Sequence, residues 1–379
     1  MDDAAPPKSR RGPRHEKSVN IALQGGGSHG AFTWGVLDKL FEDDRIWIEA
    51  ISGTSAGAMN AVVAAQGMYE DGADGARRRL EEFWRAVSKT ARTSPIQRSV
   101  WAQLTGSWSL EDSVGYQTMQ LVRGFLSPYD LNPADYNPLR DLVEEMVNFD
   151  KVRSCADMEI FVGATNVETG RVRVFERDEL SLDVVMASAC LPQLFKAVKV
   201  KGQYYWDGGF MGNPPLFPFF YNSPSDDILI VQINPIVRPG EPRSAADIQN
   251  RMNEITFNSP LLHELRAIDF VTRLLDSGRL NEDEYRRMRV HLIHDRKRLR
   301  PLDASSKSNS EWAFLKHLFE IGRDAATRWL GRNYDRIGVD STVDIRSMFD
   351  GFGALPDGLD PLTRSARAKR PGRSRKVGS

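Results

Sequence analysis

From about residue 19 the hydrophobic positions predict strands and helices in alternation. The short apolar run SVNIALQ is typical of a buried strand, and AFTWGVLDKLFE has the spacing of a helix. A second strand, WIEAIS, and an apolar helix, AMNAVVAAQG, follow. Because this β-α-β-α order is typical of a parallel sheet covered by helices, we expect an α/β fold.

Between residue 73 and about residue 148 the pattern becomes helical and lacks strand alternation. This stretch carries Trp101, Trp108, Tyr116 and Phe125. Two interpretations are open: residues 97–133 form a lid over a pocket, or the aromatic side chains are ordinary core of a helical insertion. We favour the second, because aromatic residues dominate protein cores.

Strand patterns return in MEIFVGATNV and RVRVFE, which the sequence Glu168-Thr169-Gly170 joins as a hairpin. The segment DDILIVQINP is a further buried strand, and beyond about residue 244 the pattern is mostly helical, broken by RVHLIHD. We therefore expect a disordered leader (1–18), a main domain (19–220) with a helical insertion (about 73–148), an α-rich extension packed on the same core (221–360), and a basic disordered tail (361–379).

Composition limits the classes of function. With 379 residues, 41% of them hydrophobic, the chain can bury a sizeable core. Lys plus Arg and Asp plus Glu both number 51, so no net charge favours a nucleic-acid partner. Cys155 and Cys190 lack metal-ligand spacing, and we expect no metal and no cofactor. No apolar run approaches the roughly 18 residues of a membrane span. We expect a cytoplasmic protein, with peripheral membrane contact as an open alternative.

The segment QGGGSHG, residues 24–30, lies between the first strand and the first helix and satisfies the dinucleotide-binding pattern G-x-G-x-x-G. A dinucleotide site needs an acidic residue at the end of the second strand. Asp43 and Asp44 have roughly the right spacing but precede that strand, so we expect them at the wrong end of the sheet. The sequence therefore disfavours a nucleotide-dependent oxidoreductase.

The segment GTSAG, residues 53–57, follows the second strand and precedes a helix, as in the nucleophile elbow G-x-S-x-G. Both motifs follow strands that we expect to be neighbours, so they face one another at the carboxyl edge of the sheet. Serine attack on an ester carbonyl creates an oxyanion, which backbone N–H groups at a helix N-terminus stabilise. We assign the nucleophile to Ser55 and the oxyanion hole to the N–H groups of Gly26, Gly27 and Ala56.

The serine needs a partner that takes its proton. The histidines after the elbow, His263, His291, His294 and His317, lie in helical or strand patterns, and we expect them to be structural or exposed. Asp207, in YYWDGGF, follows a strand-like run and precedes two glycines. An aspartate acts directly as a base where desolvation raises its pKa, so we assign the base to Asp207.

The motifs GGGSHG, GTSAG and DGG, in this order, with MASACLPQLFKAV before the last, resemble those of patatin-like phospholipases and acyl hydrolases over about residues 19–220. The resemblance implies a three-layer α/β/α fold with a largely parallel sheet, and hydrolysis of lipid acyl esters by a Ser-Asp dyad without an obligatory metal. It implies Ser55 as nucleophile and Asp207 as proton acceptor. It extends the oxyanion loop to Gly25, with Gly26, Gly27 and Ala56. The supporting motif residues are Ser28, His29, Gly30, Gly53, Gly57, Gly208 and Gly209.

His29 departs from the resemblance, because many family members carry Arg or Lys at this position. A histidine supplies a full positive charge only when protonated, which bears on the pH optimum and on any preference for phosphate. The alternative is that His29 only packs or caps the start of the helix.

We expect a serine acyl hydrolase whose partner is a lipid or another acyl ester. Two alternatives stay open: a catalytically silent lipid-binding or regulatory protein, and a hydrolase of thioesters or intracellular polyesters. The motifs do not distinguish head groups, acyl chain lengths or oligomeric states.

Overall fold

The structure is a computed structural model that describes residues 11–12, 15–92, 96–123 and 125–349. The expected basic tail and residues 1–10 and 13–14 of the expected leader lie outside these ranges. Within them, no helix is long and apolar enough to cross a membrane.

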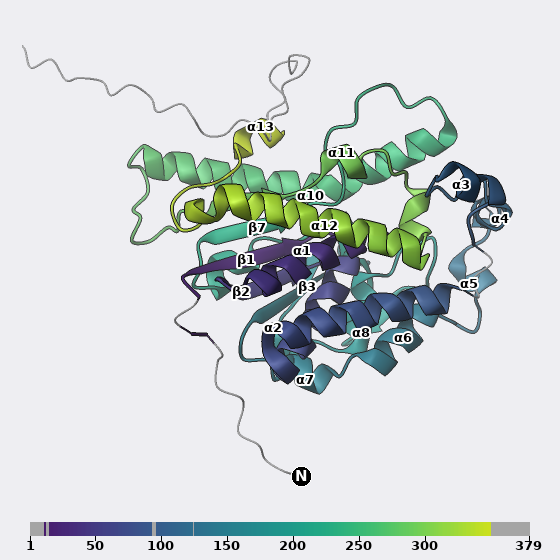
Figure 1. Cartoon of the computed structure of the whole chain (residues 1–379), viewed down its shortest axis with the longest axis horizontal. Helices are drawn as coiled ribbons and strands as arrows, with labels where there is room; N and C mark the ends of the chain where they lie inside the picture. Colours follow the sequence, from purple (N-terminus) through teal and green to yellow (C-terminus); the bar gives the residue numbers. More distant parts are fainter. Residues whose placement is uncertain (1–10, 13–14, 93–95, 124, 350–379) are drawn as a thin grey trace, which may run out of the picture.

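A mixed sheet of eight strands forms the centre of the molecule (Figure 1). The strands are β1 (Lys17–Leu23), β2 (Ile46–Gly53), β3 (Glu159–Asn166), β4 (Val172–Phe175), β5 (Val198–Val200), β6 (Gln203–Asp207), β7 (Asp227–Val231) and β8 (Arg289–Ile293). Their order is β5-β6-β3-β2-β1-β7-β8, and β4 pairs with β3. The strands β3, β2, β1, β7 and β8 are parallel neighbours, while β4 and β6 run antiparallel to β3. The predicted hairpin at residues 168–170 joins β3 and β4.

Helices surround the sheet and account for most of the remaining described residues. The α-helices are α1 (Gly30–Asp43), α2 (Ala56–Ala91), α3 (Val100–Thr105), α4 (Val114–Arg123), α5 (Pro128–Leu131), α6 (Pro138–Met146), α7 (Phe149–Arg153), α8 (Leu182–Ser188), α9 (Pro218–Asn222), α10 (Ala245–Asp276), α11 (Arg296–Leu299), α12 (Trp312–Asn333) and α13 (Ile345–Phe349). Short 3₁₀ turns are η1 (Gly27–His29), η2 (Arg177–Glu179), η3 (Gly208–Phe210), η4 (Ser305–Ser308) and η5 (Tyr334–Arg336).

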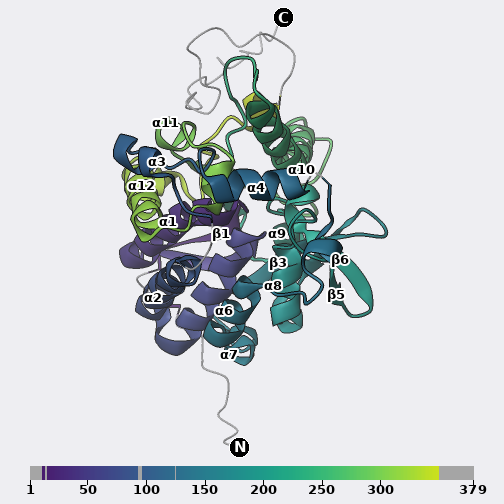
Figure 2. The same ribbon diagram turned by 90° about the vertical axis from the view of Figure 1, so that its right-hand side faces the viewer.

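The two faces of the sheet bury separate hydrophobic clusters. Side chains of β1 and β2 such as Ile21 and Ile51 pack with α1, α2, α12 and the shorter α6–α8. On the other face Ala22 and Ile230 pack with α9, α10 and α13. Figure 2 shows these helix layers on either side of the strands. The chain therefore has the expected three-layer α/β/α fold with a mostly parallel sheet and a largely helical C-terminal part.

Part of the helical insertion lies at one end of the molecule, where α3, α4 and α5 gather (Figures 1 and 2). The rest of it, the second half of α2 and α6, packs in the main hydrophobic cluster. Trp108 packs on Phe314, with 5.1 Å between ring centroids, as the core interpretation predicts. Trp101 and Phe125 are 68% and 88% exposed, so that interpretation is wrong for them. The insertion contacts the C-terminal part of the chain, because the N–H of Leu110 donates a 2.8 Å hydrogen bond to Ser305 Oγ in η4.

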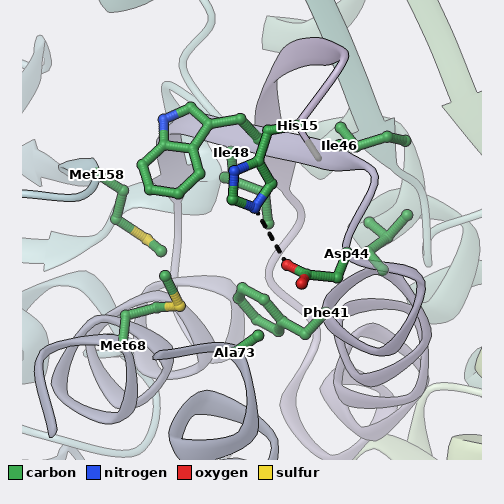
Figure 3. Close-up of a pocket in the computed structure, with 10 residues that line it drawn as sticks. His15, Phe41, Asp44, Ile46, Ile48, Met68, Ala73 and Met158 are labelled. Carbon is green, nitrogen blue, oxygen red and sulfur yellow. Dashed lines mark hydrogen bonds and ion pairs between the residues drawn. The ribbon is translucent and has the colours of Figure 1, made fainter. Parts of the chain in front are cut away.

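The start of β2 packs against His15, a residue that the sequence assigned to the leader. The ring of His15 lies 4.8 Å from that of Trp47, and His15 Nε2 is 3.2 Å from Asp44 Oδ1 (Figure 3). These residues line a cavity of about 20 Å³, room for a single water molecule. Asp44 precedes β2, whereas Ser55 follows it, so Asp44 lies at the opposite end of the sheet from the serine, as predicted.

Candidate active site

Ser55 lies in a sharp turn between β2 and α2. Its backbone has φ 55° and ψ −121°, a conformation that L-residues rarely adopt and that the surrounding structure must hold. Two glycines make the turn possible. A Cβ on Gly53 would come within 2.6 Å of the Gly57 carbonyl, and one on Gly57 within 2.3 Å of Leu23 O. The predicted elbow is therefore present, and both of its glycines are required by close backbone approach.

Two side-chain hydroxyls hold the elbow. The N–H of Ser55 donates to Ser188 Oγ at 2.9 Å, and Ser188 Oγ donates to Gly163 O at 2.6 Å. Thr54 Oγ1 donates to Gly212 O at 2.7 Å. These bonds connect the elbow to α8, to β3 and to the loop after Asp207.

The glycine loop lies against the elbow, as predicted. A Cβ on Gly25 would be 2.8 Å from Ser55 Cβ, and one on Gly30 would be 2.7 Å from Ala56 Cβ. The absence of side chains at these two positions therefore allows the loop to approach the nucleophile. Gly27 has φ 57°, in the left-handed region that favours glycine.

The N–H groups of the loop are not equivalent. Gly25 N–H donates a 2.7 Å hydrogen bond to Asn213 Oδ1, so it is already used. The assignment of Gly25 to the oxyanion hole is therefore wrong for this structure, and Gly25 instead shapes the loop. The N–H groups of Gly26, Gly27 and Ala56 donate to no other described residue, which leaves them available to a ligand.

Asp207 ends β6, opposite Ala164 of β3, and caps η3. Its Oδ1 accepts the N–H of Gly209 at 2.7 Å. Gly208 brings this turn against the elbow, since a Cβ there would lie 3.0 Å from Thr54 Cγ2 and 2.2 Å from Gly163 O. The three motifs of the sequence thus meet at one place in the fold.

Burial governs the chemistry of Asp207, whose side chain is 1% exposed. Desolvation raises its pKa to about 7, opposed by hydrogen bonding from Gly209 N–H and the Ser55 hydroxyl and by the charge of Lys307. Oδ2 has no hydrogen-bond partner of ordinary geometry among the described residues. The Ser55 hydroxyl is close enough to lower the pKa of the Asp207 carboxyl, although no hydrogen bond of ordinary geometry joins it to Oδ2. A carboxylate with a pKa near neutrality suits a general base.

His29 is buried and neutral. Its Nε2 lies 2.8 Å from Ser306 Oγ in η4. Burial, with a smaller contribution from the charge of Lys307, lowers the pKa of His29 to about 3. The next residue back, Ser28, contacts Ser310 Oγ at 3.1 Å through its hydroxyl. Of the two interpretations of His29, the structure favours packing at the start of α1 over a positive charge.

The other histidines lie away from the elbow or serve packing. His291 Nε2 pairs with Asp227 Oδ1 at 2.8 Å at the start of β7. His317 stacks on Trp108, and His263 is exposed on α10. His294 follows β8, which β1 and β7 separate from β2 in the sheet. None of these histidines makes a hydrogen bond to Ser55 in the part of the chain that the structure describes.

Sequence reasoning missed three residues that shape the site: Ser188, Asn213 and Lys307. Ser188 lies within the segment MASACLPQLFKAV, which the sequence analysis did single out, and Asn213 lies shortly after the motif DGG. Lys307 lies in the polar run DASSKSNS, which carries no signal. Among the described residues, no cluster of three or more His, Cys, Asp or Glu side chains could hold a metal ion.

Comparison with known proteins defines the class. The family model of patatin-like phospholipases matches residues 21–220. The chain therefore belongs to the patatin-like phospholipase family, a family of lipid acyl hydrolases. No curated protein matches the chain.

Two solved structures are similar to this chain. VipD from Legionella pneumophila is 17% identical, with 84% of this chain and 67% of that chain covered and a TM-score of 0.38. ExoU, in its heterodimeric complex with SpcU from the type III secretion system of Pseudomonas aeruginosa, is 14% identical, with 85% and 52% covered and a TM-score of 0.35. The chain thus spans about half the length of ExoU.

Proposed function

We propose that this protein is a serine acyl hydrolase that cleaves lipid acyl esters through a Ser55–Asp207 dyad. The observation that carries the proposal is that the elbow, the glycine loop and the turn of Asp207 lie against one another. The approach is so close that a Cβ on Gly25 would contact Ser55 Cβ, and a Cβ on Gly208 would contact Thr54.

The first half of the reaction is acylation. Ser55 Oγ attacks the ester carbonyl carbon while Asp207 accepts the hydroxyl proton. The negative charge that develops on the carbonyl oxygen is stabilised by the free N–H groups of Gly26, Gly27 and Ala56. The bond to the leaving alcohol then breaks, and Asp207 returns the proton to the alcohol oxygen. The product is an ester of Ser55 with the acyl group.

The second half is hydrolysis of that ester. Asp207 accepts a proton from water, the hydroxide attacks the acyl carbon, and the same N–H groups stabilise the second oxyanion. When the bond to Ser55 Oγ breaks, Asp207 returns its proton to the serine. The fatty acid leaves and the enzyme is unchanged, so the cycle needs no further reactant than ester and water.

The test is labelling with an active-site-directed fluorophosphonate, followed by mass spectrometry of the adduct, for wild type beside Asp207→Asn. We expect labelling at Ser55 that falls strongly in the variant, and hydrolysis of acyl esters by wild type only. Absence of labelling at Ser55 in wild type, under conditions where a control esterase reacts, would favour the alternative of a silent lipid-binding protein. Assays with thioester and polyester substrates test the remaining alternative.

A further inference from the structure

Lys307 contacts the glycine loop although it lies in η4, far away in sequence. Its carbonyl oxygen is 2.4 Å from where a Cβ on Gly27 would stand. Its ammonium donates a 2.8 Å hydrogen bond to Asn234 Oδ1, and Asn234 Nδ2 donates to Gly25 O at 2.8 Å. The charged end of Lys307 is therefore held beside the loop by one intervening amide.

The ammonium also lies near the turn that carries Asp207. It is 6.0 Å from the centroid of the Phe257 ring. That ring packs on Gly209, where a Cβ would come within 2.1 Å of Phe257 Cε1. Gly209 is the residue whose N–H bonds to Asp207. The Phe257 ring and the glycine turn thus connect the surroundings of the two charges. Asp207 is buried and Lys307 is half-buried, and charges removed from water interact more strongly than exposed ones.

Three charged side chains act on Lys307: in order of effect, these are Glu254, Arg238 and Asp207. Burial lowers the pKa of Lys307 to about 8, Glu254 and Asp207 raise it, and Arg238 lowers it. Arg238 and Glu254 form their own ion pair at 2.6 Å, so their effects on Lys307 oppose one another. His29, the only basic residue of the loop at 24–30, also faces Lys307 and is neutral.

We propose that Lys307 is a positioning residue that supplies positive charge to the active site and favours the ionised form of Asp207. The charge comes from the part of the chain beyond residue 220, outside the matched family region. The catalytic meaning of this inference rests on the proposed function, but the interaction between the two charges does not. The C-terminal part of the chain would thus complete the site electrostatically.

The direct test is NMR titration of the Asp207 carboxyl carbon in ¹³C-Asp-labelled protein, assigned by its loss in Asp207→Asn. In Lys307→Met we expect the pKa of Asp207 to rise by about one unit. Lys307→Arg retains the charge and should leave the titration within a few tenths of a unit of wild type. Lys297→Met, which removes an exposed lysine of the same region, is the matched control and should change nothing. An unchanged Asp207 titration in folded Lys307→Met would overturn the inference.

A reciprocal measurement does not depend on how Lys307→Met folds. Coupling between two sites is mutual, so Asp207→Asn must lower the pKa of the Lys307 amine by as much as Lys307 lowers that of Asp207. Titration of the ¹³Cε signal of Lys307 in wild type and Asp207→Asn measures this shift. If the lysine signal titrates identically in both proteins, the two charges do not interact and the inference fails.

Kinetics then separate this inference from the proposed function. A one-unit shift predicts that kcat/KM of Lys307→Met falls about fivefold at pH 7 and comes within about twofold of wild type at pH 9. An equal loss at both pH values would mean that Lys307 only supports the loop, which contradicts the inference. A wild type that hydrolyses no acyl ester would refute the proposed function, while the two NMR titrations would still decide the role of Lys307.

Discussion

The N–H of Ser55 donates a 2.9 Å hydrogen bond to the side-chain oxygen of Ser188, which donates in turn to Gly163 O. The backbone of Ser55, the proposed nucleophile, is thus held by a serine that lies 133 residues away in the sequence. We expect Ser188→Ala to lose about 1–2 kcal/mol of stability, because it leaves buried polar groups without partners. We also expect kcat to fall with little change in KM, since the elbow loosens. Unfolding in urea and steady-state kinetics measure the two effects.

The matched control for Ser188→Ala is Ser88→Ala, a buried serine of α2 outside the site. It should leave kcat at the wild-type value. If Ser188→Ala lost stability as expected but kept full kcat, Ser188 would support only the fold.

Gly27→Ala should affect both folding and activity. An alanine is strained in the left-handed conformation of residue 27, at φ 57°, and its Cβ would lie only 2.4 Å from the Lys307 carbonyl oxygen. The loop must therefore move. Loss of aligned N–H donors is expected to lower kcat by about 10²–10³-fold. Gly170→Ala is a close control, because Gly170 has φ 65° with nothing within 4 Å. Its cost should be the backbone strain alone, about 1 kcal/mol, without loss of activity.

The dependence of kcat/KM on pH should follow the ionisation of Asp207 and not that of His29. Because burial raises the pKa of Asp207 to about 7, kcat/KM should rise with pH as the base ionises around neutrality. His29, with a pKa near 3, is uncharged throughout this range. NMR titration of the His29 ring should show no change between pH 5 and pH 9. A ring that titrated together with kcat/KM would contradict this assignment.

Asp207→Asn should stabilise the protein while it removes activity. The folded-state pKa of Asp207 is raised to about 7 from an ordinary value of 3.8. Its contribution to stability is therefore fully present below about pH 4 and is lost as the pH rises through 7. An asparagine avoids a buried charge and still accepts the Gly209 N–H. We expect a gain of about 1–3 kcal/mol at pH 8 that disappears towards pH 4, measured by urea unfolding.

Glu264 provides a control for the effect of a buried carboxylate. It accepts the N–H groups of Leu216 and Phe217, both at 2.8 Å, and desolvation raises its pKa to about 7. Glu264→Gln should show the same pH trend in stability and retain esterase activity. If Asp207→Asn gave the same change in stability at pH 4 and pH 8, ionisation would not be its cause.

The sequence predicted the parts of the site that depend on local backbone geometry. Glycines are needed at particular positions in three turns: the strand-to-helix turns at residues 24–30 and 53–57, and the turn after Asp207. The glycine motifs therefore predict both that a turn is present and that it lies at the edge of the sheet. The parallel order of the first strands follows from the same alternation of strand and helix.

The rest depends on contacts between distant segments. The neutral state of His29 follows from burial beneath η4, and the use of Gly25 N–H follows from Asn213, 188 residues away. Neither a spacing nor a composition encodes such contacts. The exposure of Phe125 could not be predicted either, because the identity of an aromatic residue in a helical pattern does not say whether its side chain faces the core or the solvent.

The pairing of β1 with β7 has a practical consequence for expression. Residues Asn20–Leu23 are bonded on one side to β2 and on the other to Ile228–Val231, so the middle of the sheet includes a strand from beyond the matched family region. A chain truncated after residue 220 would lack β7, and the buried, apolar strand β1 would then become an edge of the sheet. Exposed edge strands of this kind promote aggregation. The boundary of homology is therefore not a boundary of folding, and soluble fragments should retain β7 and β8.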